Sequence, residues 1–255
     1  MGLFTKRNGR FGAALKSNKN LILPNAITIF GLLCGLYSII LSVEGRFVFA
    51  AYVLILAAVF DGLDGKVARL VKGTSEFGVQ LDSLCDLVSF GVAPAMLVYA
   101  WVLEPYGRIG LMAVFLFVAC GALRLARFNV QAGKISSAYF VGLPIPAAAA
   151  FIASGVIFVN YLSLNLDRTF LSVFFVVSIY ILAFLMVSTV PFYSFKKVNY
   201  LKEKPFNALV IFVLVIFVVG MYFELLFFVL VFGYITVSIA LTLLKFKKPT
   251  PPAEG

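Results

Sequence analysis

The sequence predicts an all-α protein, a polytopic membrane bundle of about eight transmembrane helices in which a core of six is followed by two more. Of its 255 residues, 62% are hydrophobic, and the mean hydropathy is +1.05, which is more apolar surface than a soluble domain buries. The apolar residues fall into segments near the ~20 residues that a helix needs to cross a bilayer, although the seventh is short. The segments are 24–43, 46–72, 75–103, 108–128, 141–162, 169–190, 206–222 and 225–244.

These segments divide the chain into four parts. They are a basic N-terminal segment (1–23), a membrane core (24–190), a basic loop with two C-terminal helices (191–244) and a tail (245–255). The first apolar run begins at about Leu21 and no small-residue cleavage site follows it, so we expect it to remain as a membrane helix. The range 206–244 has one interruption, at 220–224, which we interpret as the break between the last two helices.

The basic residues indicate the orientation in the membrane. The chain carries 21 Lys and Arg against 11 Asp and Glu, a net charge of +10. If both termini are cytoplasmic, only Arg46, Arg108 and Arg168 fall on the outer side, as the positive-inside rule requires. We therefore expect a multi-pass protein of the cytoplasmic (inner) membrane with both termini inside. Basic residues distributed over loops in this way do not form a nucleic-acid-binding patch, so we expect no nucleic-acid partner.

The stretch FDGLDGKVARLVKGTSEFGVQLDSLCD, which ends at Asp86, holds four of the 11 acidic residues. Asp61 and Asp64 are three residues apart and Asp82 and Asp86 are four apart, so each pair shares one face of a helix. The Lys-Gly-Thr sequence between the pairs predicts a turn, and hence two antiparallel helices that present four carboxylates to one another. Such charges in or near a bilayer repel and are costly to desolvate unless cations lie between them. A divalent metal site explains this arrangement, and the ion pathway of a transporter is the alternative.

The remaining composition narrows the chemistry. The chain has no histidine, which excludes histidine acid–base catalysis and the usual zinc sites and leaves the oxygen chemistry of hard cations. Its three cysteines, Cys34, Cys85 and Cys120, are isolated in apolar segments without C-x-x-C spacing. We therefore expect them to be packing residues rather than a redox pair or a disulfide framework.

The aspartate stretch has the spacing D-x2-D-G-x2-A-R-x8-G-x3-D-x3-D. The fixed positions are Asp61, Asp64, Gly65, Ala68, Arg69, Gly78, Asp82 and Asp86. In a membrane protein this pattern resembles the signature of the CDP-alcohol phosphotransferases, integral membrane enzymes in which an incoming hydroxyl displaces CMP from a CDP-linked lipid or alcohol. The resemblance makes 24–190 a catalytic core and implies two divalent cations per site, Mg²⁺ or Mn²⁺.

The resemblance also implies roles for individual residues. Asp61, Asp64 and Asp82 are expected as metal ligands, and Asp86 both as a ligand and as the general base for the attacking hydroxyl. The residues expected to contact the CDP-lipid are Asn25, Thr28, Gly65, Arg69, Ser75 and Gly78. Physical chemistry agrees, because glycine lets a nucleotide approach the backbone, the arginine fork binds phosphate, and a ring of carboxylates can hold the two metal ions that bridge a reacting diphosphate. Asn25 precedes an apolar run, so it is alternatively a helix N-cap.

Residues 20–150 resemble one branch of this family more closely. The stretches LPNAITIFGLLCGLYSI, FGVQLDSLCDLVSFGVAPA, GALRLARFNV and YFVGLPIPAAAA resemble the phosphatidylserine synthases, whose donor is CDP-diacylglycerol and whose acceptor is L-serine. Two alternatives stay open: a transferase of the same family with glycerol phosphate or inositol phosphate as acceptor, and a cation-coupled transporter. The family also implies a homodimer in contact with membrane lipid.

Arg124, Arg127 and Asn129 fit an amino-acid acceptor. The two arginines are three residues apart, so they share a helix face, and they lie at the same depth in the membrane as the aspartates. A guanidinium binds a carboxylate such as that of serine in bidentate fashion, so we expect these three residues to bind serine or phosphate. Alternatively, the arginines are positive-inside anchors or contacts to lipid headgroups.

Overall fold

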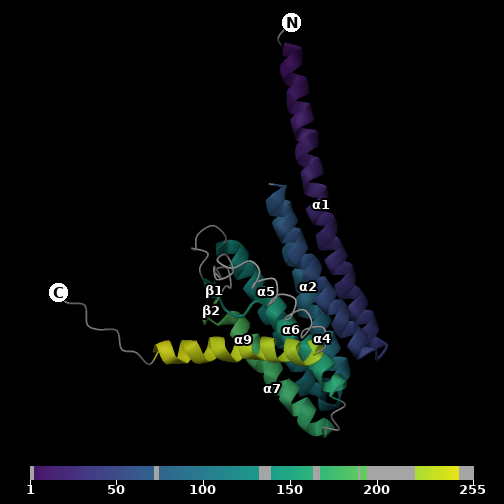
Figure 1. Cartoon of the computed structure of the whole chain (residues 1–255), viewed down its shortest axis with the longest axis vertical. Coiled ribbons are helices and arrows are strands. Elements are labelled where there is room, and N and C mark those ends of the chain that lie inside the picture. Colours follow the sequence, from purple (N-terminus) through teal and green to yellow (C-terminus); the bar gives the residue numbers. More distant parts are fainter. Residues whose placement is uncertain are drawn as a thin grey trace, which may run out of the picture.

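The computed structural model describes residues 3–71, 75–131, 139–162, 167–188, 190–193 and 222–246. The chain begins with a hairpin of two long helices, α1 (Leu3–Val43) and α2 (Phe47–Leu70), which pack side by side (Figure 1). Gly45, with φ of 75°, lies in the tight turn between them, a conformation that glycine adopts without steric cost. The turn predicted at 72–74 lies outside the described residues.

Helix α1 differs from its predicted bounds. It begins at Leu3 and continues through Pro24, which lies inside the helix. A proline is tolerated within a membrane helix because neighbouring helices and side chains satisfy the backbone groups that it frees, and the Lys, Arg and Ala residues before it favour helix. The prediction that the first helix starts at residue 24 is therefore wrong, and so is the alternative that Asn25 is an N-cap.

The segment that follows residues 72–74 is helical from Glu76 to Gln131, but its helix type changes several times. Its parts are α3 (Glu76–Asp86), the π-helix η1 (Leu87–Val92), α4 (Ala93–Val98), the π-helix η2 (Tyr99–Leu103), the 3₁₀ turn η3 (Glu104–Tyr106) and α5 (Gly107–Gln131). The chain reverses direction at Gly107, whose φ is 51°, so that α5 packs back against η1 and η2. A π-helix begins directly after Asp86, and such segments often occur at functional sites.

The remaining described elements are α6 (Ile145–Tyr161), α7 (Arg168–Val187), α9 (Phe223–Phe246) and two short strands, β1 (Tyr139–Val141) and β2 (Pro191–Tyr193). Pro144 precedes α6 directly and Pro146 is in its first turn, as expected for proline at a helix start. The strands pair antiparallel, with Phe140 opposite Phe192, a feature that the all-α prediction misses. Helix α9 crosses the bundle at a steep angle and packs against α6 (Figure 1).

The predicted helical membrane bundle is confirmed at the level of architecture. Among the described residues, five helical segments are long and apolar enough to cross a bilayer: Ile22–Val43, Phe47–Leu70, Glu76–Val130, Arg168–Val187 and Phe223–Ala240. Helix α6 is apolar but shorter, and Glu76–Val130 covers two of the predicted spans because it folds back on itself. The predicted span 206–222 lies outside the described residues, so the count of eight is not confirmed.

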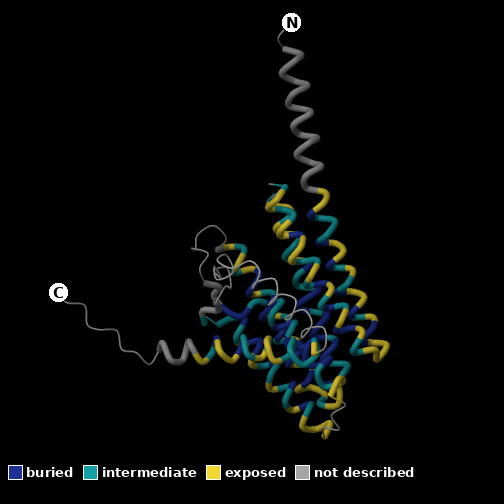
Figure 2. The backbone as a smooth tube through the Cα atoms, viewed as in Figure 1, coloured by how far each residue is buried: buried dark blue, intermediate teal, exposed yellow. Residues whose placement is uncertain are grey.

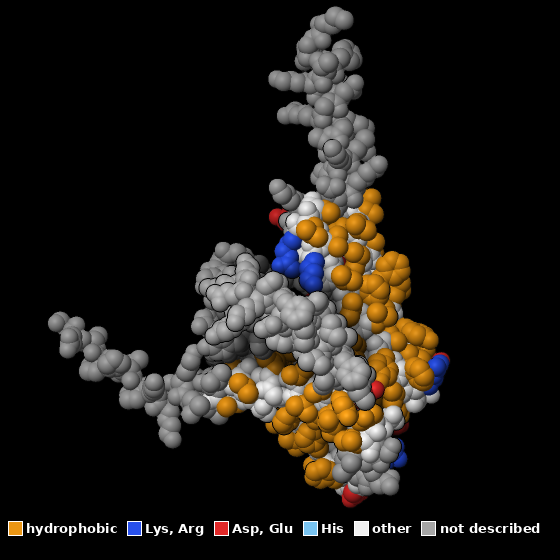
Figure 3. All heavy atoms as spheres, in the orientation of Figure 1, with side chains coloured by type: hydrophobic (Ala, Val, Ile, Leu, Met, Phe, Trp, Pro, Cys, Tyr) orange, Lys and Arg blue, Asp and Glu red, His pale blue; other side chains and the backbone are white. Residues whose placement is uncertain are grey.

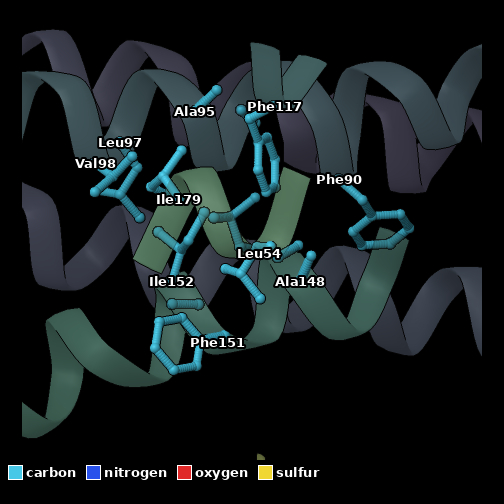
Figure 4. Close-up of a cluster of buried hydrophobic side chains, with 14 of the residues drawn as sticks. Leu54, Phe90, Ala95, Leu97, Val98, Phe117, Ala148, Phe151, Ile152 and Ile179 are labelled. Atoms are coloured by element: carbon cyan, nitrogen blue, oxygen red, sulfur yellow. The ribbon is translucent and has the colours of Figure 1, made fainter. Parts of the chain in front are cut away.

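The core lies where α2, α4, α5, α6 and α7 meet, and the surface of the bundle is apolar. Figure 2 shows the buried residues concentrated in the middle of the bundle. Phe117 projects toward Leu54 and Ala148, Ile152 and Ile179 lie beside them, and Phe90 lies at the edge of the cluster (Figure 4). Hydrophobic side chains cover most of the visible surface of the described helices (Figure 3), as expected for a surface that faces lipid.

One glycine contact brings α1 unusually close to the helix that carries Asp86. A Cβ atom on Gly35 would lie 2.6 Å from Oγ and 2.8 Å from Cα of Ser89 in η1. The Ser89 hydroxyl also donates a hydrogen bond to the carbonyl oxygen of Gly31, at 3.2 Å. Since the nearest atoms include backbone, a side chain at position 35 can be accommodated only if the two helices separate.

We expect Gly35→Ala to lower the thermal unfolding midpoint in detergent, with a loss of about 1–3 kcal/mol from overpacking. Gly31→Ala is the matched control, one turn earlier in α1, because its Cβ would meet Phe60 at an ordinary 3.6 Å. The control should be as stable as the parent protein or slightly more stable, since alanine favours helix over glycine. Equal midpoints for the two variants would show that the α1–η1 contact is not tight.

Candidate functional site

Four carboxylates meet between α2 and α3, as the spacing predicted. Asp61 and Asp64 lie in α2, and Asp82 and Asp86 lie in α3. Carboxylate oxygens of Asp61, Asp64 and Asp82 lie within 4.8 Å of one another, and the carboxyl groups of Asp61 and Asp86 are within hydrogen-bonding distance. All four line one pocket of about 200 Å³ that is walled by α1, α2, α3 and η1. We call it the carboxylate pocket.

The local sequence explains why these side chains converge. In α2 the three-residue spacing turns Asp61 and Asp64 to one face, and Asp64 is only 5% exposed. Helix α3 starts at its N-cap Ser75, whose hydroxyl accepts a hydrogen bond from the backbone N–H of Gly78 at 3.0 Å. This cap sets the phase of α3, so that Asp82 and Asp86 face the pair on α2.

The donor set of the carboxylate pocket fits a divalent cation. Its carboxylates offer only oxygen atoms, which are the ligands that Mg²⁺ and Mn²⁺ prefer. Asp61, Asp64 and Asp82 are close enough to be ligands of one ion or of two neighbouring ions. Like charges at this separation and burial are unfavourable unless positive charge compensates them.

A second pocket of about 590 Å³ adjoins the first and shares Thr28, Asp64 and Asp82 with it. We call it the outer pocket. The structure brings to its wall all six residues expected to contact the CDP-lipid: Asn25, Thr28, Gly65, Arg69, Ser75 and Gly78. They come from α1, from the end of α2 and from the start of α3.

The two glycines of the outer pocket differ in the space that is available for a side chain. A Cβ atom on Gly65 would meet nothing within 4 Å, whereas one on Gly78 would lie 3.2 Å from Ser75 Oγ and 3.3 Å from Asn25 Oδ1. Packing therefore does not require glycine at position 65, and its bare backbone faces the open pocket. Arg69 Nε donates to the carbonyl oxygen of Gly65 at 2.8 Å, which uses one of the five N–H groups of the guanidinium.

The three residues expected to bind the acceptor, Arg124, Arg127 and Asn129, interact with different parts of the structure. None of them lines the two pockets. Arg124 is 8% exposed, attracted electrostatically to Asp86, and its Nε has no hydrogen-bond partner among the described residues. Arg127 instead donates to the carbonyl oxygens at the end of α7, those of Met186, Val187 and Ser188, at 3.0–3.3 Å.

The third of these residues, Asn129, joins α5 to the carboxylate helix. Its Nδ2 donates to the hydroxyl of Ser83, the neighbour of Asp82 in α3, at 2.9 Å. Arg127 and Asn129 therefore hold α5 against α7 and α3, while Arg124 interacts electrostatically with Asp86. Direct contact of Arg127 or Asn129 with a substrate stays a prediction.

Three further residues that were not expected from the sequence lie at the site or interact with its residues. Cys85 and Ser89 line the carboxylate pocket, and their spacing from Asp82 and Asp86 already puts them on the same helical face. Tyr234 of α9 interacts electrostatically with Arg124. Nothing in the sequence indicated Tyr234, because only the packing of α9 brings it to the site.

Comparison with known proteins agrees with this geometry. Residues 21–192 match the family model of CDP-alcohol phosphatidyltransferases. The chain is 40% identical over 195 residues to the CDP-diacylglycerol–serine O-phosphatidyltransferase of Helicobacter pylori, covering 75% of this chain and 80% of that protein.

Two further relatives support the same family. The chain is 35% identical over 176 residues to the CDP-diacylglycerol–serine O-phosphatidyltransferase of Bacillus subtilis, covering 69% of this chain and 92% of that protein. The archaetidylserine synthase of Methanothermobacter thermautotrophicus is 42% identical over 134 residues, 52% of this chain and 56% of that protein. With the match over 21–192, these similarities show that the chain belongs to the CDP-alcohol phosphatidyltransferase family.

Proposed function

We propose that the chain transfers the phosphatidyl group of CDP-diacylglycerol to the hydroxyl of L-serine, releasing CMP and leaving phosphatidylserine in the membrane. The observation that carries this proposal is the junction of two pockets. One is lined by four carboxylates, and the other is lined by Asn25, Gly65, Arg69, Ser75 and Gly78, which are expected to contact the CDP-lipid. The relatives named for serine as acceptor, over 75% and 69% of this chain, support the choice of substrate.

The donor binds across the two pockets. The cytidine half lies in the outer pocket, against the open backbone of Gly65 and beside Arg69, whose planar fork suits phosphate oxygens. The diphosphate reaches the shared wall of Asp64 and Asp82. Mg²⁺ or Mn²⁺ ions held by the aspartates, two per site, would supply positive charge that stabilises the reacting phosphate oxygens. The acyl chains remain in lipid along the apolar surface of the bundle.

Asp86 is the general base of the proposed reaction. It lies in the carboxylate pocket within hydrogen-bonding distance of Asp61, so a serine hydroxyl bound there can give it a proton. The serine oxygen then forms a bond to the phosphorus that carries the diacylglycerol. The bond from this phosphorus to the bridging oxygen breaks, and CMP leaves with the electron pair.

Arg124 is the residue best placed to bind the serine carboxylate. It is buried, interacts electrostatically with Asp86, and has an N–H without a partner among the described residues. A buried donor of this kind is costly unless a ligand satisfies it. Its burial also argues against the alternative of an exposed membrane anchor, for which arginine keeps its head in water or among headgroups.

The membrane arrangement completes the proposal. We place both termini and the two pockets on the cytoplasmic side of the inner membrane, with eight transmembrane helices and a homodimeric assembly. The distribution of Lys and Arg supports the orientation. The helical segment Glu76–Val130 has 55 residues and is long enough to cross the membrane twice. It therefore supports more membrane crossings than the five candidate segments alone would give.

A direct test is CMP release by purified protein in detergent, with CDP-diacylglycerol and Mn²⁺ or Mg²⁺. Serine, glycerol 3-phosphate and inositol phosphate are offered separately, and a chelator added to the serine reaction is the control. We expect release only with serine, and its loss with the chelator. Release with a phosphorylated acceptor would retain the chemistry and overturn the proposed substrate, whereas no release with any acceptor would overturn the proposal as a whole.

A further inference from the structure

Thr28 of α1 occupies the boundary between the two pockets. It lines both of them, and it is 8% exposed. Its hydroxyl lies 2.7 Å from Oδ2 of Asp64, in the facing helix α2, and 3.1 Å from the carbonyl oxygen of Pro24, one turn earlier in its own helix. The family resemblance implies that Thr28 faces the nucleotide, but in the structure its hydroxyl is directed to a carboxylate.

Only one of these two oxygens can receive the hydroxyl proton. The carbonyl oxygen of Pro24 is four residues before Thr28, which is the position that accepts the backbone N–H of residue 28 within the helix. The Asp64 carboxylate carries a negative charge and gives the shorter distance, and hydrogen bonds to ionised acceptors are roughly twice as strong as neutral ones. Thr28 therefore donates its hydroxyl hydrogen bond to Asp64.

This hydrogen bond restricts the rotation of the Asp64 carboxylate. The terminal torsion of an aspartate is broad, so burial alone does not fix the direction of its oxygens. With Oδ2 held by a donor from the opposite helix, the plane of the carboxylate is set relative to Asp61 and Asp82. Carboxylates that bind metal are commonly oriented by such partners, and loss of the partner typically costs 10- to 100-fold in metal affinity.

We propose that Thr28 is a positioning residue: its hydroxyl orients Asp64 and thereby sets the affinity of the carboxylate pocket for divalent cations. The nucleotide is not the partner of this hydroxyl. The inference rests on the proposed function only in that the carboxylate pocket holds a divalent cation.

The test is Mn²⁺ binding by purified full-length protein in detergent, measured from the electron paramagnetic resonance signal of free Mn²⁺. Thr28→Val keeps the shape and removes the hydroxyl, so its dissociation constant for Mn²⁺ should rise by about 10- to 100-fold. Thr28→Ser keeps the hydroxyl and should bind like the parent protein. If Thr28→Val does not yield folded protein, Thr28→Ala also lacks the hydroxyl and carries the same expectation.

Ser38→Ala is a matched control. Ser38 also lies in α1, is fully buried, and donates across the same helix pair, to the carbonyl oxygen of Ala50 at 2.9 Å. It lines neither pocket, so its removal should leave Mn²⁺ affinity unchanged even if stability falls. A loss of affinity equal to that of Thr28→Val would show that the effect is general loosening of the α1–α2 pair and would overturn the inference.

Kinetics separate this inference from the expected nucleotide contact. In Thr28→Val, the Mn²⁺ concentration for half-maximal CMP release should rise while KM for CDP-diacylglycerol at saturating Mn²⁺ stays near the parent value. A raised KM with unchanged Mn²⁺ binding would return Thr28 to the nucleotide and overturn the inference. If the parent protein binds Mn²⁺ but releases no CMP, the proposed function fails while the binding test of Thr28 still stands. A parent protein that binds no Mn²⁺ would overturn the inference itself.

Discussion

Replacing Asp86 with asparagine will lower serine-dependent CMP release by about 10²- to 10⁴-fold, the usual contribution of a general base. The amide has nearly the same shape but cannot accept the proton of the serine hydroxyl. Because the change also removes one of four like charges from a confined pocket, the protein should fold at least as well as the parent. The rate and the thermal unfolding midpoint, measured on the same preparation, separate lost chemistry from lost structure.

Glu76→Gln is the control for the Asp86 variant. It makes the same chemical change in the same helix, at an exposed position in the first turn that lines neither pocket. Its rate should stay within about twofold of the parent protein. If Asp86→Asn retained a rate within tenfold of the parent, another group would be taking the proton, and the assignment of Asp86 would have to be abandoned.

Replacing Arg124 with glutamine will lower kcat/KM for serine by about 30- to 1,000-fold, which corresponds to about 2–4 kcal/mol for a lost charge-assisted contact. The expected defect lies in the KM for serine, because glutamine cannot offer the charged fork to a carboxylate. Arg124→Lys keeps the charge but lacks the planar fork, so its kcat/KM for serine should lie between the values of the parent protein and of Arg124→Gln. Initial rates over a serine titration, at saturating CDP-diacylglycerol, provide the measurement.

Arg108→Gln tests whether this effect is local. Arg108 lies at the opposite end of the same helix, is exposed, and lines neither pocket. Its kinetic constants should match those of the parent protein. A rise in KM for CDP-diacylglycerol rather than serine in Arg124→Gln would show that the guanidinium binds phosphate, which was the other role that the sequence allowed.

The sequence was sufficient to predict the carboxylate pocket because its geometry is mainly local. Spacings of three and four residues orient each pair of aspartates, and α2 and α3, which carry the two pairs, follow each other closely in the sequence. The positions that line the outer pocket follow from the same two helix ends, with Asn25 and Thr28 added from the adjacent helix of the hairpin. For such a site, motif spacing and helix periodicity carry most of the information.

Partners far apart in the sequence could not be predicted in this way. Thr28 meets Asp64 across 36 positions, Ser83 meets Asn129 across 46, and Arg127 reaches Val187 across 60. Each pairing depends on how two helices pack and rotate against each other, and hydropathy alone does not specify that rotation. Arg127 shows the consequence, because a helix-capping arginine and a substrate-binding arginine look the same in a sequence.

The apolar pattern of the sequence also could not predict where the helix type changes. The π-helical turns after Asp86 and after Val98 insert an extra residue into an otherwise helical segment. Nothing in the composition of these segments distinguishes them from an ordinary membrane helix. The strand pair β1–β2 is three residues long on each side, which is too short for an alternating pattern to stand out.

The hydrogen bond between Ser83 and Asn129 has a consequence for how new specificities can arise on this scaffold. The proposed donor side is built from α1, α2 and the start of α3, whereas the proposed acceptor side is built from α5, and this bond joins the two beside Asp82. Because the proposed donor residues lie on other helices than Arg124, we expect substitutions around Arg124 to change the accepted alcohol more than the binding of the CDP-lipid. In this arrangement, the donor side stays constant and the acceptor side is the part that can vary.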